Sequence, residues 1–577
     1  MQVTVGARQI NESARSGGGL LIEGALLLSV LLVSALFFWP LFNRETTLSY
    51  SIGYNLYGAE RVLSGEIPYR DFHTLYPPAT VYLNAAIFKL LGTTLYNALL
   101  GVFIFKVLTT IMLYACGRMI MPRVWALFAA AASLLWLRPN GPFKAVPMHY
   151  GALFLACALF LVLRYLHSSR RLYLFGAGIS LGALALFKHN IGAYALAGTS
   201  LLFLPVKKRD AGEVSSIGFS DLLILLGGFV LPVLPVVLYM ASQDGLAAMT
   251  RTLVFGPGDF LLSRLAGWPS PVAFLLFSLA VAAAAILLYR LRPDARLAAF
   301  SLTAIALACI SIVVFSGQSV IDGLIFYTPV GVIVSGAVIT LIEIRRGDPR
   351  WRVSLSVLVI AAAAFFEAFP RFAREQAVAS MPFVTLLLLY LAYLSAPLIE
   401  RMTDALKGPD AWRRASSALL AVVLPLTVFL IGGRMFLSTY FDSRLHFKSD
   451  TELMTDRGRG VFFPEARAKE IDGAVSYIRE RTREDDFFFA HAYAGSSYLF
   501  LADRNNPSGA QFWGGVGVTD SERAETLRAL EERRVELIIT TDRDLRAERY
   551  DPMREYIESN YRIDRQFGEA MMLERIK

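Results

Sequence analysis

Long apolar runs recur through the first three quarters of the chain, and they restrict its fold more than any other feature. Each run holds roughly 15 to 24 residues, close to the about 20 that an α-helix needs to cross the hydrocarbon core of a bilayer. Hydrophobic residues make up 55% of the 577 residues and charged residues 18%, a composition typical of multi-pass membrane proteins. We therefore predict an α-helical polytopic membrane protein with about thirteen transmembrane helices. The predicted spans are 20–42, 98–116, 124–137, 151–166, 172–187, 191–206, 222–241, 272–289, 297–315, 324–344, 353–369, 383–398 and 416–433.

Lys and Arg residues concentrate in alternate loops, and this pattern sets the predicted orientation. The cation-rich loops are expected on the cytoplasmic side, which places the loop 43–97 and the chain after Arg434 on the outer face. The net charge of +9 is then mostly a topology signal. Nucleic acid is not a predicted partner, because the basic residues are spread over many short loops. Compact cytoplasmic loops favour a bacterial inner membrane as the location.

The composition changes near Arg434, which divides the chain into two predicted domains. Residues 1–434 form a membrane domain, whose first outer loop at 43–97 carries two surface helices. Residues 435–577 form a small soluble extracytoplasmic domain, in which helical patterns at 464–482 and 521–534 alternate with strand-like runs at 486–490 and 536–541. That alternation is typical of an α/β fold with a parallel sheet. The three cysteines fall inside predicted spans and show no metal-ligand spacing.

The first outer loop combines charges, aromatic residues and a Pro-Pro pair. Apolar residues recur at helical spacing over 56–63 and again over 81–91, which predicts two short helices lying on the membrane surface. The turn between them presents Arg70, Asp71 and His73. Asp71 has two interpretations, as a proton acceptor or as the partner of Arg70 in a structural pair that fixes the turn.

Further polar side chains lie at or near the ends of predicted spans on the same side as Asp71. They are Lys144, Lys188, His189, Arg371 and Arg374, while Lys106 lies well inside the second span. A charge at a helix centre costs about 2.5–3.5 kcal/mol, so each needs an explanation. Snorkelling of Lys188 and interfacial anchoring by the arginines are the structural explanations. Gathered in one cavity with a carboxylate, these cations suit group transfer from a lipid-linked phosphate.

Four segments of the chain resemble the GT-C superfamily of polytopic glycosyltransferases, especially bacterial members related to protein O-mannosyltransferases and the lipid A aminoarabinose transferase. The first outer loop is similar to the opening motif of that superfamily, and three later segments resemble its glycine-rich helix with a lysine, its Pro-Arg segment and its outer domain. The matching residues are Tyr54, Ala59, Leu63–Gly65, Pro68–Phe72, Tyr76–Pro78, Gly182–Asn190, Phe369–Arg371, Met381–Pro382, Asp485–Phe489 and Tyr498–Arg504. The resemblance implies a polyprenyl-phosphate sugar donor, transfer on the outer face, and an acid in the first outer loop as the base.

The chain departs from that pattern at one position. Many relatives carry an Asp-Glu pair where this sequence has Ser51 and Ile52. We therefore predict Asp71 as the catalytic base, with Glu66 as second choice. The predicted substrate-binding residues are Arg70, His73, Tyr76, Lys144, Lys188, His189, Arg371 and Arg374. A divalent cation is compatible with this set, but the sequence does not require one and predicts no metal site.

Two other classes of function stay open at the level of sequence. A flippase or transporter of lipid-linked sugars also needs cations in a membrane cavity. A non-catalytic protein of the same fold that binds envelope glycans would tolerate the loss of the Asp-Glu pair. The predicted partners are the bilayer, a polyprenyl-phosphate sugar and a glycan, lipid or protein acceptor.

Overall fold

A computed structural model describes most of the chain. The described residues are 17–48, 50–136, 144–204, 218–255, 318–368, 374–404, 433, 450–492, 494–510, 519–548 and 550–576. The predicted spans at 272–289 and 297–315 lie outside them, as does almost all of the span at 416–433.

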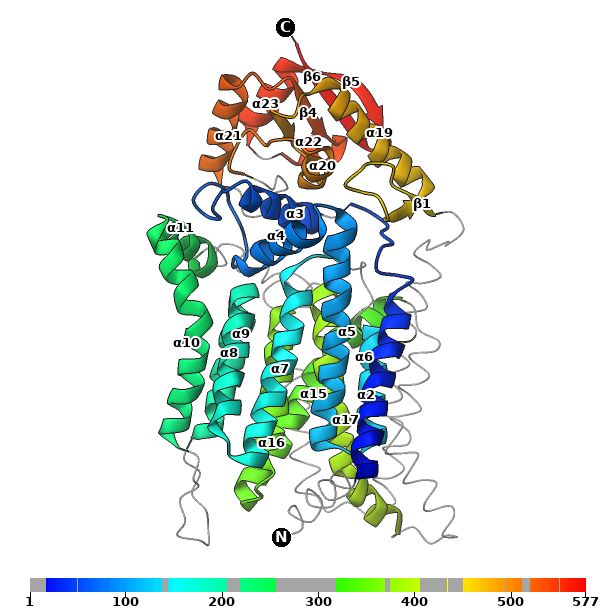
Figure 1. Cartoon of the computed structure of the whole chain (residues 1–577), viewed down its shortest axis with the longest axis vertical. Helices are drawn as coiled ribbons and strands as arrows, with labels where there is room; N and C mark the ends of the chain where they lie inside the picture. The colour runs from blue at the N-terminus through cyan, green and yellow to red at the C-terminus, as the bar shows by residue number, and fades with distance from the viewer. Residues whose placement is uncertain are drawn as a thin grey trace.

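The described membrane part is a bundle of roughly parallel helices with the C-terminal domain at one end, here named the domain end (Figure 1). Among the described residues, six helical segments are long and apolar enough to cross a membrane, and they are Gly19–Phe38, Leu95–Ile120, Pro147–Ser168, Phe219–Ser242, Thr328–Arg346 and Gln376–Leu394. The predicted number of about thirteen spans is not confirmed by this part of the chain. The bundle comprises α2 (Gly17–Phe38), α5 (Leu95–Ile120), α6 (Arg123–Trp136), α7 (Pro147–Ser168), α8 (Arg171–Phe187), α9 (His189–Ser200), η1 (Leu201–Phe203), α10 (Phe219–Ser242), α11 (Leu246–Thr250), η2 (Arg251–Phe255), α15 (Gln318–Arg346), α16 (Trp351–Phe365), η3 (Phe366–Ala368) and α17 (Arg374–Asp404).

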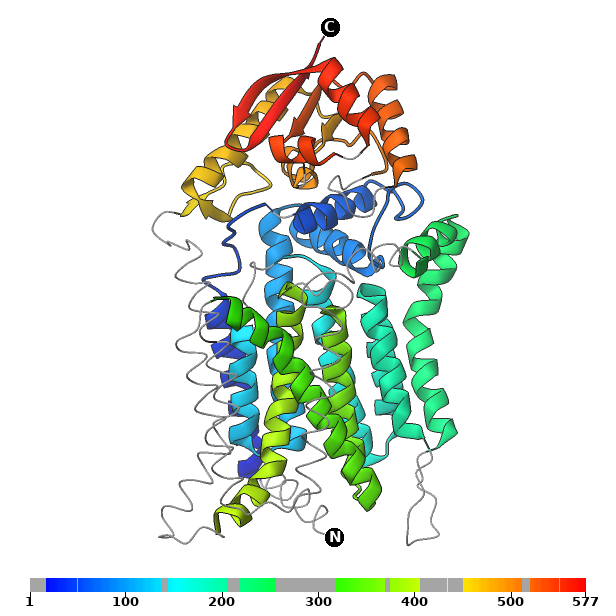
Figure 2. The ribbon, with the colours of Figure 1, turned by 180° about the vertical axis from the view of Figure 1, so that it is seen from behind.

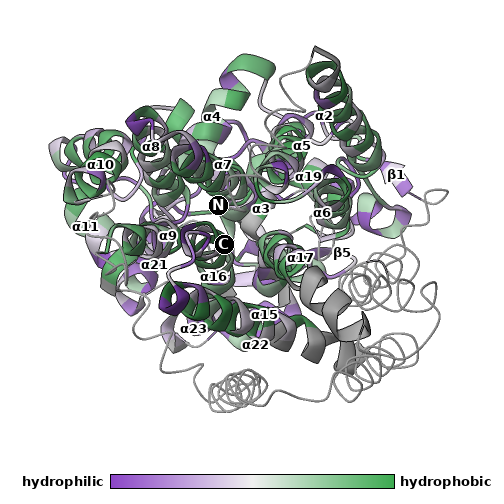
Figure 3. Ribbon diagram, turned by 90° about the horizontal axis from the view of Figure 1, so that it is seen from below, coloured by the Kyte–Doolittle hydropathy of each residue, from purple (hydrophilic) through white to green (hydrophobic). Residues whose placement is uncertain are grey.

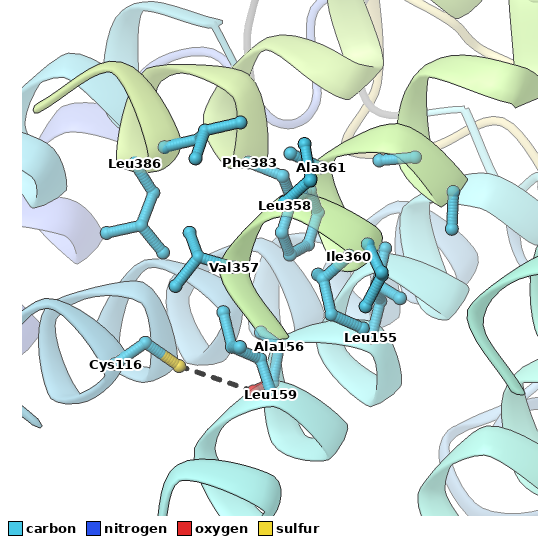
Figure 4. Packing of buried hydrophobic residues seen from close by; sticks show 14 of the residues in the cluster. Cys116, Leu155, Ala156, Leu159, Val357, Leu358, Ile360, Ala361, Phe383 and Leu386 are labelled. Atoms are coloured by element: carbon cyan, nitrogen blue, oxygen red, sulfur yellow. Dashed lines mark hydrogen bonds between the residues drawn. The ribbon is translucent and has the colours of Figure 1, made fainter. Parts of the chain in front are cut away.

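Close packing of small residues holds the bundle together. Helix α16 packs between α7 and α17, with Val357 and Ile360 among its buried side chains (Figure 4). Helices α8 and α10 touch at Gly178 and Gly228, where an added Cβ would overlap a backbone oxygen of the other helix. Small residues let helix backbones approach each other in this way. The outward face of α10 is hydrophobic, as expected for contact with lipid (Figure 3).

Two helices lie across the domain end of the bundle, α3 (Tyr50–Leu63) and α4 (Ala79–Leu91) (Figure 1). They correspond to the two surface helices expected in the first outer loop. Helix α3 ends before Gly65, whose φ of +90° suits glycine. Pro78 directly precedes α4, where proline costs no backbone hydrogen bond.

The C-terminal domain is a small α/β unit above α3 and α4 (Figure 2). Its helices at 465–481 and 520–532 and its strands at 488–490 and 537–540 match the sequence pattern. The sheet, however, is mixed: β3 and β4 are parallel, whereas β6 and β5 are antiparallel in the order β3-β4-β6-β5. A short turn joins β5 to β6, and so short a connection only allows an antiparallel pair. The elements are β1 (Asp450–Glu452), β2 (Phe462–Pro464), α19 (Glu465–Arg481), β3 (Phe488–Ala490), α20 (Gly495–Ala502), α21 (Asp520–Glu532), β4 (Leu537–Thr540), α22 (Asp542–Ala547), α23 (Asp551–Asn560), β5 (Tyr561–Phe567) and β6 (Ala570–Arg575).

The C-terminal domain docks on α3 and α4 through closely fitted contacts. A Cβ added at Gly53 of α3 would overlap the backbone nitrogen of Ser497 in α20. Arg457 forms an ion pair with Glu60 of α3 at 2.7 Å. The rings of Phe88 and Phe500 stack with their centroids 5.6 Å apart. The first loop and the last domain therefore form one packed layer.

We predict that Gly53→Ala loosens this layer. The added methyl group has no room beside Ser497, and overpacking of this kind typically costs about 1–3 kcal/mol. The variant should melt at a lower temperature and become more sensitive to limited proteolysis in the C-terminal domain. Gly24→Ala is the matched control, because nothing lies within 4 Å of its added Cβ. Equal behaviour of the two variants would contradict the tight contact.

Candidate functional site

A buried carboxylate lies at the domain end, in the connection between α2 and α3. Glu45 is 2% exposed, and its Oε1 has no hydrogen-bond partner among the described residues. Burial raises the pKa of Glu45 to about 8, although the positive charges of Lys144 and Lys106 act in the opposite direction. A carboxyl group held out of water with a lone pair unused is suited to accept a proton or a hydrogen bond.

Two lysines, Lys106 and Lys144, act on this carboxylate, and His149 is subject to the charges of the same two lysines. Lys106 projects from α5 and is 2% exposed. Lys144 precedes α7, and its carbonyl oxygen lies 2.7 Å from Nδ1 of His149, in the first turn of α7. Together with Glu45 they form the Glu45 cluster. Because four residues from three separate segments of the chain meet here, the cluster exists only in the folded protein.

A second charged pair, Lys188 and Glu367, lines a cavity beside the start of α7. Lys188, between α8 and α9, lies 3.4 Å from Oε1 of the buried Glu367. Its Nζ is 4.6 Å from the centroid of the Tyr76 ring, a cation–π distance. Lys188 and Glu367 border a narrow cavity whose other lining residues are apolar, among them Met148.

The first turn of α7 connects the two sets of charges. Met148 lines the cavity beside Lys188, and the next residue, His149, belongs to the Glu45 cluster. The ring of Tyr150 lies 5.0 Å from that of Phe105 and 5.9 Å from that of Phe187. The amino end of a long helix carries a partial positive charge. The arrangement therefore presents several positive charges around α7, with two carboxylates among them.

Asp71, the predicted base, is engaged in its own turn. Its carboxylate accepts two hydrogen bonds from Arg70, at 2.9 and 2.7 Å, and one from the backbone N–H of Ile67 at 2.7 Å. The bonds from Arg70 are the main reason that the pKa of Asp71 lies below its usual value. Arg70 also donates to Gln243, which directly follows α10. The second choice, Glu66, pairs with Arg61 at 2.5 Å.

The other predicted residues occupy different surroundings. His73 faces the C-terminal domain, where its Nδ1 lies 3.3 Å from Oε1 of Glu522, and burial lowers its pKa. Tyr76, Lys188 and Lys144 take part in the two charged sets described above. His189 begins α9, and its Nδ1 is buried without a hydrogen-bond partner in the described structure.

Two predicted residues are not characterised by the structure. Arg371 lies outside the described residues, and so does the side chain of Arg374, although its backbone begins α17. Their contacts with a donor phosphate remain predictions. Among the described residues, no group of three or more His, Cys, Asp or Glu side chains is arranged to hold a metal ion.

Glu45 was not predicted from the sequence, and neither Lys106 nor His149 was given a specific role. Glu45 follows the first predicted span by only three residues and lies in the same loop as the predicted base. An acid so close to the end of a predicted span is the one sequence feature that could have indicated Glu45. Nothing in the sequence indicates that it faces Lys106 and Lys144, because that proximity arises from packing between distant segments.

Solved structures of similar fold are known. No family model and no curated protein matches the sequence. ArnT from Cupriavidus metallidurans in the apo state superposes with a TM-score of 0.51 at 14% identity, over 97% of this chain and 98% of ArnT. ArnT bound to undecaprenyl phosphate gives 0.50 over the same shares, also at 14% identity. This chain has the ArnT fold. The fold expected from the sequence motifs is therefore confirmed.

A second solved structure is more distant. The archaeal oligosaccharyltransferase AglB from Archaeoglobus fulgidus, in complex with an inhibitory peptide and a dolichol-phosphate, gives a TM-score of 0.45 at 15% identity. The match covers 90% of this chain and 70% of AglB. At such identities the likeness is one of fold, so the activity has to be argued from the site.

We predict that Glu45→Gln changes how stability depends on pH. Because the pKa of Glu45 is raised from 4.5 to about 8, the folded protein holds this proton more tightly than the unfolded chain. The stabilising effect of the protonated carboxyl is fully present below about pH 4.5 and is lost as the pH rises to about 8. The variant, which cannot ionise, should therefore melt at a progressively higher temperature than the parent across that window.

Thermal unfolding in detergent between pH 4.5 and 8 measures this difference. Glu465→Gln is the matched control, because Glu465 is exposed on α19 in an ion pair with Lys469. A difference between parent and Glu45→Gln that stays constant with pH would show that Glu45 is not buried.

Proposed function

We propose that this protein is a glycosyltransferase that moves a sugar from a polyprenyl-phosphate carrier to a cell-envelope acceptor. The transfer takes place on the outer face of the cytoplasmic membrane. The observation that carries the proposal is the Glu45 cluster, in which a buried carboxylate lies beside two lysines at the end of a bundle with the ArnT fold. ArnT itself has been solved bound to undecaprenyl phosphate.

The proposed chemistry separates two tasks. The acceptor hydroxyl attacks the anomeric carbon of the donor, the bond from that carbon to the phosphate oxygen breaks, and the lipid phosphate leaves with both electrons. Lys106, Lys144 and Lys188 stabilise the negative charge on the phosphate, assisted by the amino end of α7. A carboxylate accepts the proton of the hydroxyl as the new glycosidic bond forms.

Three carboxylates, Glu45, Asp71 and Glu66, are candidates for the role of proton acceptor. The best base has a pKa near the working pH, and Glu45, with a pKa of about 8, meets that condition. The three hydrogen bonds to Asp71 make it a weaker base and favour its role in holding the turn. We therefore place Glu45 first and retain Asp71, with Glu66 behind it, as the rival.

Substitution of each carboxylate tests this order. Purified protein in nanodiscs is supplied with radiolabelled polyprenyl-phosphate sugars and an envelope extract as acceptor. Glu45→Gln should lower the transfer rate by about 10²–10⁴-fold, the usual effect of a lost general base. Glu465→Gln should keep the parent rate. A large loss in Asp71→Asn with Glu45→Gln unaffected would assign the role to Asp71.

The cations are tested by binding of the donor. Lys188→Met and Lys144→Met remove one positive charge each from around α7, whereas Lys89→Met removes one from an exposed position on α4. The first two variants should raise the KM for the donor, and Lys89→Met should leave it unchanged. If the protein instead moves the intact carrier across liposomes, it is a flippase. If it binds the donor without any turnover, it is a non-catalytic protein of the same fold.

A further inference from the structure

The connection that carries Glu45 is paired with the C-terminal domain as a short strand. The backbone oxygen of Asn43 accepts a hydrogen bond from the N–H of Phe462 at 2.9 Å, and the N–H of Glu45 donates to the oxygen of Phe462 at 2.8 Å. The side-chain amide of Asn43 donates to the oxygen of Gly460 at 2.8 Å. Three hydrogen bonds therefore hold residues 43–45 along strand β2.

Strand β2 is itself anchored within its own domain. It pairs antiparallel with β1, so that residues 43–45, β2 and β1 form a small three-stranded arrangement. Arg44 reaches across it to Asp450 of β1 at 2.7 Å, with its guanidinium 4.9 Å from the centroid of the Phe462 ring. A charge-assisted bond to a carboxylate that is itself buried adds strength to the pairing.

The same segment of the C-terminal domain also rests on α5, the helix that carries Lys106. Gly460 has a φ of +80°, and a Cβ there would lie 2.8 Å from the ring of Tyr96. The N–H of Leu95 donates to the oxygen of Arg457 at 2.8 Å. Residues 457–462 of the C-terminal domain therefore have two contacts with the site. They are hydrogen-bonded to the segment that carries Glu45, and they pack on α5, which carries Lys106.

Burial of Glu45 requires such a restraint. A carboxylate in a connection between two helices has free access to water unless the backbone is fixed, and water favours its charged form. The hydrogen bonds to β2 supply that restraint from a different domain. Among the described residues 39–48, no backbone hydrogen bond within the connection itself involves Glu45.

We propose that Asn43 is a positioning residue and that strand β2 of the C-terminal domain holds Glu45 against Lys106 and Lys144. The effect on catalysis rests on the function proposed above, whereas the placement of Glu45 does not. The C-terminal domain is then part of the site, since without it the carboxylate and the lysines are not held together.

Chemical labelling tests the placement without any substrate. Glu45→Cys protein is treated with a small water-soluble methanethiosulfonate, and modification of position 45 is followed by peptide mapping. Adding Asn43→Ala should speed this modification about three- to tenfold, the effect of losing one net hydrogen bond. Asn97→Ala is the matched control, because the Asn97 amide also donates to backbone oxygens, at 2.8 Å, but in the turn between α4 and α5. Equal rates in the Asn43→Ala and Asn97→Ala proteins overturn the proposal.

A second measurement keeps the proposal testable if the cysteine variant does not fold. The pH-dependent difference in melting temperature between the parent and Glu45→Gln is measured again with Asn43→Ala present in both proteins. Loss of positioning lets Glu45 reach water, so this difference should shrink, whereas Asn97→Ala should preserve it. If Asn43 has only a structural role, Asn43→Ala lowers the melting temperatures of the parent and of Glu45→Gln equally, and the pH-dependent difference between them stays the same. That result overturns the proposal. Neither readout involves sugar transfer, so an inactive protein still answers the question.

Discussion

The placement of a carboxylate next to two lysines in a dry environment is the interaction on which the site depends. Removing Glu45 from water is unfavourable for its charged form, and Lys106 and Lys144 offset only part of that effect. The balance leaves the group able to gain or lose a proton near neutral pH. A fully solvated acid would be permanently ionised there, and one in a tight ion pair, as Asp71 is with Arg70, would hold its charge even more firmly.

Two layers of structure maintain that environment. The bundle supplies the lysines on α5 and before α7, and small residues such as Gly178 let its helices pack closely. The crosswise helices α3 and α4 lie between part of the bundle and the C-terminal domain, which they contact closely, as at Gly53 and Ser497 (Figure 1). The candidate site lies where these layers meet, so it draws on the stability of both.

Much of the fold follows from local sequence pattern, whereas the site does not. Apolar periodicity and the Pro-Pro pair indicated α3, α4 and the C-terminal helices, because those signals act over a few neighbouring residues. The β5–β6 hairpin was missed, which made the predicted sheet parallel. Glu45 and Lys106 come together through contacts between segments that are far apart in the sequence, and no local sequence pattern indicates this. Arg70 and Asp71 are neighbours in the sequence, but only the structure shows that they form an ion pair that fixes the turn.

The bond between Asn43 and Gly460 joins positions 417 apart in the chain. Synthesis proceeds at about 5–20 residues per second, so roughly 20–80 s separate the emergence of the two partners from the ribosome. During that interval the first loop has no β2 to pair with. A half-made chain therefore contains the lysines of the bundle without a fixed acid between them, and the site cannot be completed before the C-terminal domain has been made.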